Sequence, residues 1–268
     1  MSLSFPNIDP VAISLGPFDV RWYALAYLAG FLLGWKYIAY LCRRFYAGIP
    51  NTPADKDSDD LLMWIVLGVI VGGRIGYVLF YQFELYAAQP LDALKLWQGG
   101  MSFHGGLLGV IAATFLYARA KSFDFLRVMD LLACAAPIGL FFGRAANFIN
   151  GELYGRVTSS PLGMIFPSGG PYPRHPSQLY EAVLEGLVVF IVLFVAARRG
   201  WLATYKGLCS GLFLMLYGVF RFGIEFFRQP DRQLGFIFDM ITMGQILCLP
   251  MIAGGAFLIW LSVARKKA

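Results

Sequence analysis

The chain has 268 residues, with 22 Lys and Arg against 16 Asp and Glu, so its formal net charge is +6. It is 58% hydrophobic and only 14% charged, whereas soluble domains average about 25% charged residues. This composition excludes a disordered chain, a nucleic-acid-binding domain and an ordinary cytosolic enzyme. It favours cationic side chains placed at a membrane surface.

Seven apolar runs follow one another along the chain, and a membrane-spanning helix needs about 20 such residues. We therefore predict an all-α, polytopic integral membrane protein in which residues 1–268 form a single transmembrane domain. The connections 82–102 and 150–177 are expected to form a cap on the outer side. The predicted spans are Trp22–Leu41, Leu61–Tyr81, Phe103–Tyr117, Leu131–Ile149, Leu179–Ala197, Gly207–Phe227 and Ile241–Leu261.

The distribution of Lys and Arg between the connections predicts the orientation. The segments after spans one, three, five and seven hold twelve of these residues, and the segments on the opposite side hold six. Because cytoplasmic loops are enriched in Lys and Arg, we expect the N-terminus outside and the C-terminus in the cytoplasm. An odd number of spans agrees with this orientation.

Two further patterns concern cysteine and acidic residues. The cysteines lie in or beside apolar runs without metal-type spacing, so we expect buried thiols and neither a disulfide framework nor a zinc site. They are Cys42, Cys134, Cys209 and Cys248.

The acidic run at 55–60 is expected to be a solvated loop in which Asp59 or Asp60 caps the second helix.

Three arginines, Arg74, Arg144 and Arg221, lie inside apolar runs. An arginine at the centre of a bilayer costs roughly 2.5–3.5 kcal/mol on insertion scales, so each must face a partner or a wet cavity. One interpretation is a functional site, since intramembrane ionisable groups are functional by default. The other is structural ion pairing, or extension of the side chain to the interface.

The sixth predicted span carries a polar stripe. Arg221, Glu225 and Arg228 follow at spacings of four and three, with Tyr217 one turn earlier, so all four are expected on one helix face. This arrangement puts the guanidinium groups of Arg221 and Arg228 around the carboxylate of Glu225. One positive charge is then not neutralised and is available to bind an anionic ligand.

The fourth predicted span ends in a second polar group. Arg144 and Asn147 are three residues apart on one face, and Asn150 and Glu152 follow as the chain leaves the helix. The planar fork of arginine suits a phosphate, and asparagine can donate to ester or glycerol oxygens. In the fifth span, Glu181 and Glu185 are four residues apart, and their structural role would be to pair with the arginines.

One histidine, His104, stands among glycines in the run Gly99–Gly106, where the third span begins. Glycine allows the backbone to bend and to approach a ligand. A lone histidine is usually a structural residue, and the sequence alone does not decide between that role and a functional one.

The run Gly143–Gly155 resembles the signature of bacterial prolipoprotein diacylglyceryl transferases, which reads Gly-Arg-x-(Gly or Ala)-Asn-Phe-apolar-Asn-x-Glu-x-x-Gly. Every fixed position of that pattern is met. The resemblance extends in family order over nearly the whole chain. It includes Arg21–Tyr23, Gly72–Tyr77, the His104 motif, Arg174–Glu181 and Glu225–Asp231. The segment between Gly155 and Arg174 is shorter than in some family members, which affects the outer loop.

This resemblance implies a reaction. Such enzymes move the diacylglyceryl group of phosphatidylglycerol onto the thiol of the lipobox cysteine in a prolipoprotein signal peptide. A thioether forms and glycerol phosphate leaves, as the first step of lipoprotein maturation in the bacterial inner membrane. The implied partners are these two substrates and membrane lipids, without nucleic acid, metal or cofactor.

The resemblance and the residue chemistry together suggest roles. His104 is the candidate base for the thiol, while Arg144 and Arg221 are candidate clamps for the negative charge of the leaving group. The headgroup would be positioned by Asn147, Glu152, Tyr23 and Tyr77. The rest of the predicted substrate-binding set is Gly155, Arg74, Tyr217, Glu225 and Arg228.

Two other classes of protein remain as alternatives. A transporter or channel also has buried charges and glycine-rich helices, but the sequence lacks a pair of matching broken helices in two halves. A structural membrane scaffold leaves the Arg221 stripe and His104 unexplained. A covalent lipid–peptide product would separate the transferase from both alternatives.

Overall fold

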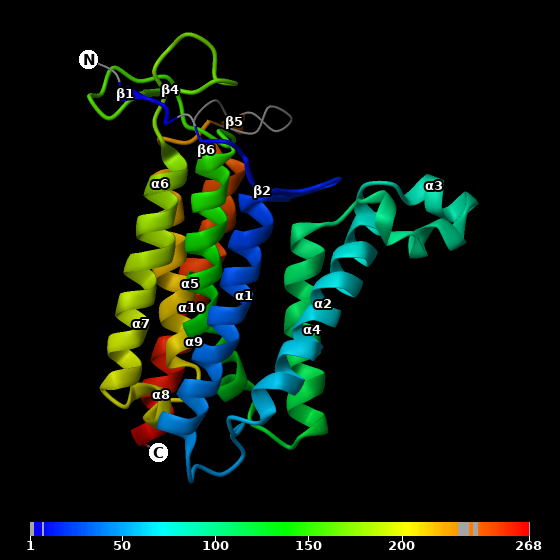
Figure 1. Ribbon diagram of the computed structural model, residues 1–268. Helices are drawn as coiled ribbons and strands as arrows, with labels where there is room; N and C mark the ends of the chain where they lie inside the picture. Colours follow the sequence, from blue (N-terminus) through cyan, green and yellow to red (C-terminus); the bar gives the residue numbers. More distant parts are fainter. Residues whose placement is uncertain (1–2, 7, 230–235, 238–240, 268) are drawn as a thin grey trace. The chain divides into compact units, whose positions relative to one another are not determined.

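The computed structural model describes residues 3–6, 8–229, 236–237 and 241–267 (Figure 1). Contacts between Cα atoms divide the chain into two compact units. The larger unit combines Met1–Ile38 with Asp130–Ala268, and the smaller unit is Ala39–Met129.

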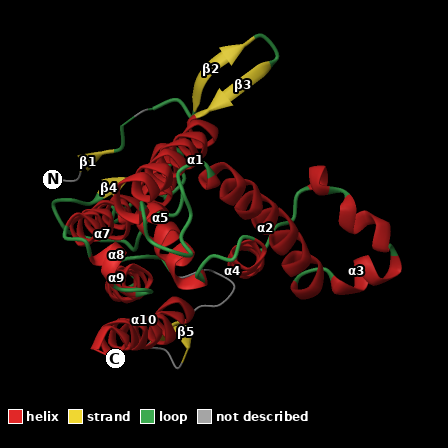
Figure 2. Cartoon of the chain, turned by 90° about the horizontal axis from the view of Figure 1, so that it is seen from below, coloured by secondary structure: helices red, strands yellow, loops and turns green. Residues whose placement is uncertain are grey.

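Long helices running side by side form the larger unit (Figures 1 and 2). A π-helical segment lies within the span that leads into α7, and the short α8 follows that helix. The helices of this unit are α1 (Trp22–Leu41), α5 (Phe125–Ile149), α6 (Ser177–Glu181), the π-helix η4 (Ala182–Val188), α7 (Val189–Arg198), α8 (Trp201–Thr204), α9 (Leu208–Ile224) and α10 (Met243–Lys267). The first part of α5 and the last part of α1 belong to the smaller unit.

Short strands that the sequence pattern does not predict accompany this bundle. The antiparallel hairpin of β2 (Val11–Leu15) and β3 (Phe18–Arg21) turns at Gly16, which has a φ of +62°, and leads directly into α1 (Figure 2). The other strands pair two residues each: β1 (Leu3–Ser4) with β4 (Met164–Ile165), and β5 (Phe236–Ile237) with β6 (Ile241–Thr242).

The smaller unit consists mainly of two packed helices, α2 (Asp57–Phe80) and α4 (Phe103–Ala120). The π-helix η1 (Cys42–Tyr46) precedes them. Their connection contains α3 (Phe83–Ala88) and two 3₁₀ turns, η2 (Pro90–Leu94) and η3 (Leu96–Gln98). The connection lies at one end of the helix pair in Figure 1.

Glycines on both helices allow α2 and α4 to approach closely. A Cβ atom added to Gly109 would collide with the carbonyl oxygen of Gly68, and one added to Gly105 would collide with that of Gly72. Gly68, Gly72 and Gly76 follow one another at a spacing of four along α2. Small residues at this spacing bring membrane helices into direct backbone contact.

All seven predicted apolar runs are helical. Among the described residues, six helices are long and apolar enough to cross a membrane, and α9, with 17 residues, is a shorter apolar helix. The protein is therefore a mostly helical, multi-pass membrane protein. The four cysteines are buried free thiols, as predicted.

The ends of several helices differ from the prediction. Helix α5 begins at Phe125 rather than at Leu131, and α10 runs from Met243 to Lys267, while Ile241–Thr242 form strand β6. Helix α2 begins at Asp57, and Asp57, Asp59 and Asp60 occupy its first turn, where carboxylates interact favourably with the helix dipole. Neither Asp59 nor Asp60 is a cap residue. Helix α9 ends at Ile224, so Glu225 and Arg228 lie beyond its last helical residue.

Candidate functional site

Two arginines and three glutamates meet inside the larger unit. Arg144 comes from α5 and Arg221 from α9, whereas Glu181 ends α6 and Glu185 lies in η4. Glu225 directly follows α9. The three glutamates are buried, and the side chains of Arg144 and Arg221 are 19% and 12% exposed, so each arginine side chain keeps some accessible surface.

The ion pairs connect these groups into one network. Glu181 Oε2 is 2.9 Å from Arg144 Nε, and Glu181 Oε1 accepts a hydrogen bond of 2.7 Å from Arg221 Nη1. Glu225 Oε2 is 3.1 Å from Arg221 Nη2. Glu185 lies farther away, with its oxygens 3.9 Å from Arg144 Nη2 and 3.8 Å from Arg221 Nη1. The structural pairing expected for Glu181 and Glu185 is therefore confirmed.

The charge balance of this network differs from the sequence prediction. The predicted stripe places Arg221 and Arg228 around the Glu225 carboxylate, with one cation in excess. In the structure Arg221 lies near three carboxylates, because Glu181 of α6 and Glu185 of η4 approach it together with Glu225. The pair between Arg221 and Glu225 is confirmed. Arg228 does not continue the helical stripe, since α9 ends four residues before it.

Asn147 and Glu152 form a second polar group at the end of α5. Asn147 Nδ2 donates to Glu152 Oε1 at 2.9 Å, and Asn150 Nδ2 donates to the same oxygen at 3.3 Å. Gln178, whose side chain is fully buried, donates to the backbone oxygen of Glu152. The Gln178 Oε1 atom has no hydrogen-bond partner within the described part of the chain.

Gly155 allows two segments to pack closely after α5. Its backbone nitrogen donates to the oxygen of His175 at 2.8 Å, and an added Cβ would collide with the Phe227 oxygen. The neighbouring Arg156 donates to the backbone oxygens of Arg228 at 2.9 Å and Glu225 at 3.1 Å. The segment that carries Glu225 is therefore held by the chain after Gly155.

His175 packs into the same region. Its Nδ1 is 3.2 Å from the Tyr180 hydroxyl, and its ring centroid is 5.1 Å from that of Phe227. Burial lowers the pKa of His175 below its ordinary value. This histidine belongs to the motif Arg174–Glu181, but no role was assigned to it from the sequence.

Two predicted tyrosines of the larger unit occupy helices next to aromatic partners. The Tyr23 hydroxyl is 2.9 Å from the Tyr27 hydroxyl in α1. The Tyr217 ring stacks on Phe213 in α9, with centroids 5.8 Å apart. Gly244 in α10 was not predicted, although a Cβ there would come within 2.9 Å of the Glu225 carboxylate. A glycine among apolar residues carries no sequence signal for such a contact.

Arg74 belongs to the smaller unit, where backbone carbonyls surround its guanidinium group. Nε donates to the oxygen of Ala93 at 2.7 Å, and Nη2 donates to that of Asp92 at 2.9 Å. The ring of Tyr86 lies 5.2 Å from its central carbon. The remaining acceptors are the backbone oxygens of Lys95, Gly99 and Gly100. Arg74 thus orders the connection that leads into α4.

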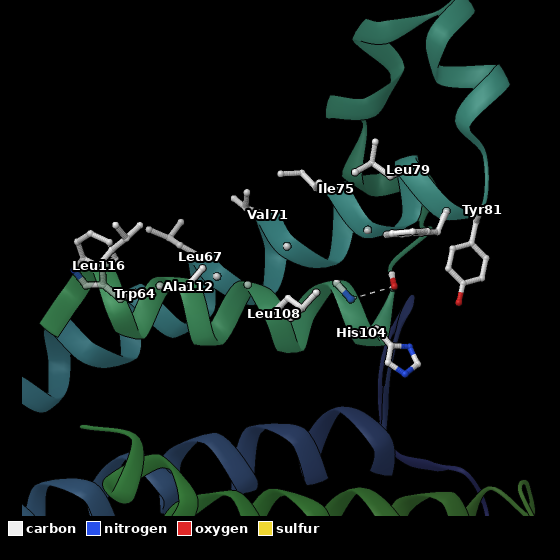
Figure 3. A pocket seen from close by; sticks show the side chains of 18 residues that line it. Trp64, Leu67, Val71, Ile75, Leu79, Tyr81, His104, Leu108, Ala112 and Leu116 are labelled. Atoms are coloured by element: carbon white, nitrogen blue, oxygen red, sulfur yellow. Dashed lines mark hydrogen bonds between the residues drawn. The ribbon is translucent and has the colours of Figure 1, made fainter. Parts of the chain in front are cut away.

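His104 and Tyr77 also lie in the smaller unit. His104 is exposed in the first turn of α4, where the Ser102 hydroxyl caps the helix by accepting from Gly105 N at 3.2 Å. Tyr77 stacks on Tyr81, with centroids 5.5 Å apart. His104 lines a mostly apolar groove of about 940 Å³ between α2 and α4. Figure 3 shows His104 and Tyr81 near one end of this groove, with Trp64 and Leu116 at the other.

The predicted site residues therefore fall into two groups. Arg144, Arg221 and Glu225 form one ion-pair network, and Asn147 with Glu152 form a hydrogen-bonded pair in the same unit. Arg74, Tyr77 and His104 belong to the other unit. Among the described residues, no three His, Cys, Asp or Glu side chains are grouped closely enough to hold a metal ion.

These features define a polytopic helical membrane protein with an arginine–glutamate network inside its bundle. The family model for prolipoprotein diacylglyceryl transferase matches residues 10–261. A phosphatidylglycerol–prolipoprotein diacylglyceryl transferase of Rhodospirillum rubrum is 54% identical over 266 residues, covering 99% of this chain and 95% of the relative. Relatives with the same description in Paramagnetospirillum magneticum and Rickettsia felis are each 51% identical, covering 97% and 96% of this chain and 96% and 98% of the relatives. The chain belongs to the prolipoprotein diacylglyceryl transferase family.

Proposed function

We propose that this protein transfers the diacylglyceryl group of phosphatidylglycerol to the lipobox cysteine of prolipoproteins. The observation that carries the proposal is the pair of partly exposed arginine side chains, Arg144 and Arg221, which buried carboxylates hold together inside a helical bundle. Both substrates of this reaction are membrane-bound, so an enzyme embedded in the bilayer is suited to them. Family membership over residues 10–261 supports the same reaction.

The proposed step is a displacement at an sp³ carbon. The substrate thiol gives its proton to a base, and its sulfur attacks the glyceryl carbon that bears the phosphate ester. A carbon–sulfur bond forms as the carbon–oxygen bond breaks, and glycerol phosphate leaves with the electron pair. Because a free thiol has a pKa of about 8.5, a base is needed at neutral pH.

The roles follow from this charge movement. His104, exposed at the start of α4, is the proposed base. Arg144 and Arg221 stabilise the charge that develops on the leaving phosphate. Asn147, Glu152, Tyr23 and Tyr77 position the headgroup, and Arg74 contributes by ordering the connection before α4. The proposed binding set also includes Gly155, Tyr217, Glu225 and Arg228.

We further propose a single transmembrane domain with seven spans in the bacterial inner membrane. The short apolar helix α9, the sixth of these spans in chain order, is added to the six longer helices. The excess of Lys and Arg in the connections after odd-numbered spans favours an outside N-terminus and a cytoplasmic C-terminus. The connections 82–102 and 150–177 would then lie on the outer side. An active periplasmic reporter fused after Ala268 would contradict this orientation.

The test is a transfer assay with the purified protein in detergent. We expect phosphatidylglycerol carrying labelled acyl chains to give a lipidated lipobox peptide, identified by its mass. A matched peptide with serine in place of cysteine is the control and should stay unmodified. A transporter or scaffold would give no covalent product with either peptide, and that outcome would refute the proposal.

A further inference from the structure

Glu181 bridges the two arginines of the network. Its oxygens lie 2.9 Å from Arg144 Nε and 2.7 Å from Arg221 Nη1, so one carboxylate joins residues from α5 and α9. The Glu181 side chain is only 1% exposed. Both contacts are therefore made away from solvent, where an electrostatic contact is stronger than in water.

The neighbouring glutamates do not share this geometry. Glu185 is just as buried, but its oxygens are 3.8 and 3.9 Å from the two arginines, beyond hydrogen-bond distance. Glu225 has its short contact with Arg221. Within the described part of the chain, Glu181 is the carboxylate within 3 Å of both guanidinium groups.

The backbone changes its winding at the bridging residue. Glu181 is the last residue of α6, and the π-helix Ala182–Val188 begins directly after it. A π-helical turn is rare and is often found at functional sites. Here the π-helix begins directly after Glu181, which makes both short contacts, and it contains Glu185, which makes the two long contacts.

We propose that Glu181 is a positioning residue that fixes the distance and relative angle of the two guanidinium groups for the phosphate of the lipid. The inference rests on the proposed function. A long arginine side chain has many rotamers, and holding two of them in one geometry costs conformational entropy. One buried carboxylate that contacts both sets this geometry before the substrate binds. Pre-set donors stabilise developing charge without reorganisation during the reaction.

Length and charge at position 181 can be tested separately. Glu181→Asp keeps the charge but shortens the side chain, so it cannot reach both arginines. Glu181→Gln keeps the length but offers one acceptor oxygen and no charge. Glu185→Asp is the matched control, since it shortens a buried carboxylate in the same span that makes only long contacts.

The measurement is kcat and KM for phosphatidylglycerol in the transfer assay, with thermal unfolding in detergent as the check on folding. We expect Glu181→Asp to lower kcat about 10- to 100-fold, because a displacement near 1 Å at a reacting group has effects of this size. KM should change less than about threefold, and Glu185→Asp should lose clearly less kcat. If Glu181→Asp does not fold, Glu181→Gln is measured instead. A fall in its kcat without a comparable change in KM then supports the inference.

Three results would overturn the inference. Wild-type kcat in Glu181→Asp would show that the residue serves only charge balance. A lower KM with unchanged kcat in Glu181→Gln would show that the carboxylate competes with the phosphate. Equal loss in the two aspartate variants would remove any special role of the bridge. An inactive wild-type protein would instead refute the proposed function, so the two failures are distinguishable.

Discussion

Arg221 is the more heavily engaged of the two arginines in the network. It contacts Glu181, Glu185 and Glu225, whereas Arg144 contacts the first two. Because removing one partner leaves buried carboxylates without compensation, loss of a buried ion pair costs about 3–5 kcal/mol. These arginines therefore contribute to folding stability as well as to the proposed chemistry.

We predict that Arg144→Ala and Arg221→Ala each lose about 10²- to 10³-fold in transfer rate. Arg221→Ala should also unfold at a lower temperature in detergent than Arg144→Ala. It removes a cationic partner from three buried carboxylates, whereas Arg144→Ala removes one from two. Lysine at either position should restore little activity, since the planar fork is lost. The rate is measured per folded protein. Near-normal transfer by folded Arg144→Ala would show that this arginine is structural only.

His104 gives a prediction about pH. Glutamine retains hydrogen bonding but cannot take up the thiol proton, and general-base catalysis is worth roughly 10²- to 10⁴-fold. His104→Gln should therefore lose activity at neutral pH and recover part of it as the pH approaches about 8.5, where the substrate thiol ionises unaided. A ratio of variant to wild-type rates that stays flat with pH would exclude the base role.

His175 gives a prediction about stability. Because burial lowers its pKa, the folded protein binds a proton at this site less readily than the unfolded chain. The free energy of unfolding should therefore fall as the pH drops below about 6.5, where the unfolded chain takes up the proton first. Thermal unfolding between about pH 7.5 and 5.5 tests this. His175→Gln should show a weaker pH dependence, and parallel curves for the two proteins would contradict the assignment.

Among the elements, α2 and α4 depend most directly on the absence of side chains. An added Cβ at Gly109 meets the Gly68 backbone, whereas one at Gly106 in the same helix is 3.8 Å from its nearest neighbour, the oxygen of Val69. We predict that Gly109→Ala destabilises the protein by about 1–3 kcal/mol through overpacking. Gly106→Ala should be neutral or slightly stabilising. Thermal unfolding of both variants is the measurement, and equal midpoints would contradict this packing.

The sequence predicts the existence of these elements better than their ends. Apolar length identifies all seven helical runs, because the cost of leaving backbone groups unpaired in a bilayer forces such runs into helices. The start of α2 at Asp57 was missed because acidic residues are common both in loops and in first turns. The partners of Arg74 were missed because they are backbone carbonyls in a connection without periodicity.

At the scale of the whole molecule, some of the residues predicted from the sequence belong to the larger unit and others to the smaller unit. Arg144 and Arg221 were identified because a charge inside an apolar run requires a partner. Glu181, Glu185 and Glu225 were named as possible partners from the sequence. Which arginine each carboxylate contacts, and at what distance, was not predictable, because it depends on how α6 and η4 pack beside α5 and α9. The membership of Arg74, Tyr77 and His104 in the smaller unit also follows from tertiary contacts rather than from local sequence.

The central claim is group transfer from lipid to peptide. The most direct measurement quantifies both products of one reaction. The lipidated lipobox peptide is measured by mass spectrometry, and the released glycerol phosphate is measured by phosphorus NMR. The account predicts one glycerol phosphate for each thioether formed, and no release when the peptide carries serine in place of cysteine. Release of glycerol phosphate without peptide lipidation would indicate lipid hydrolysis and would contradict the account, as would the absence of both products.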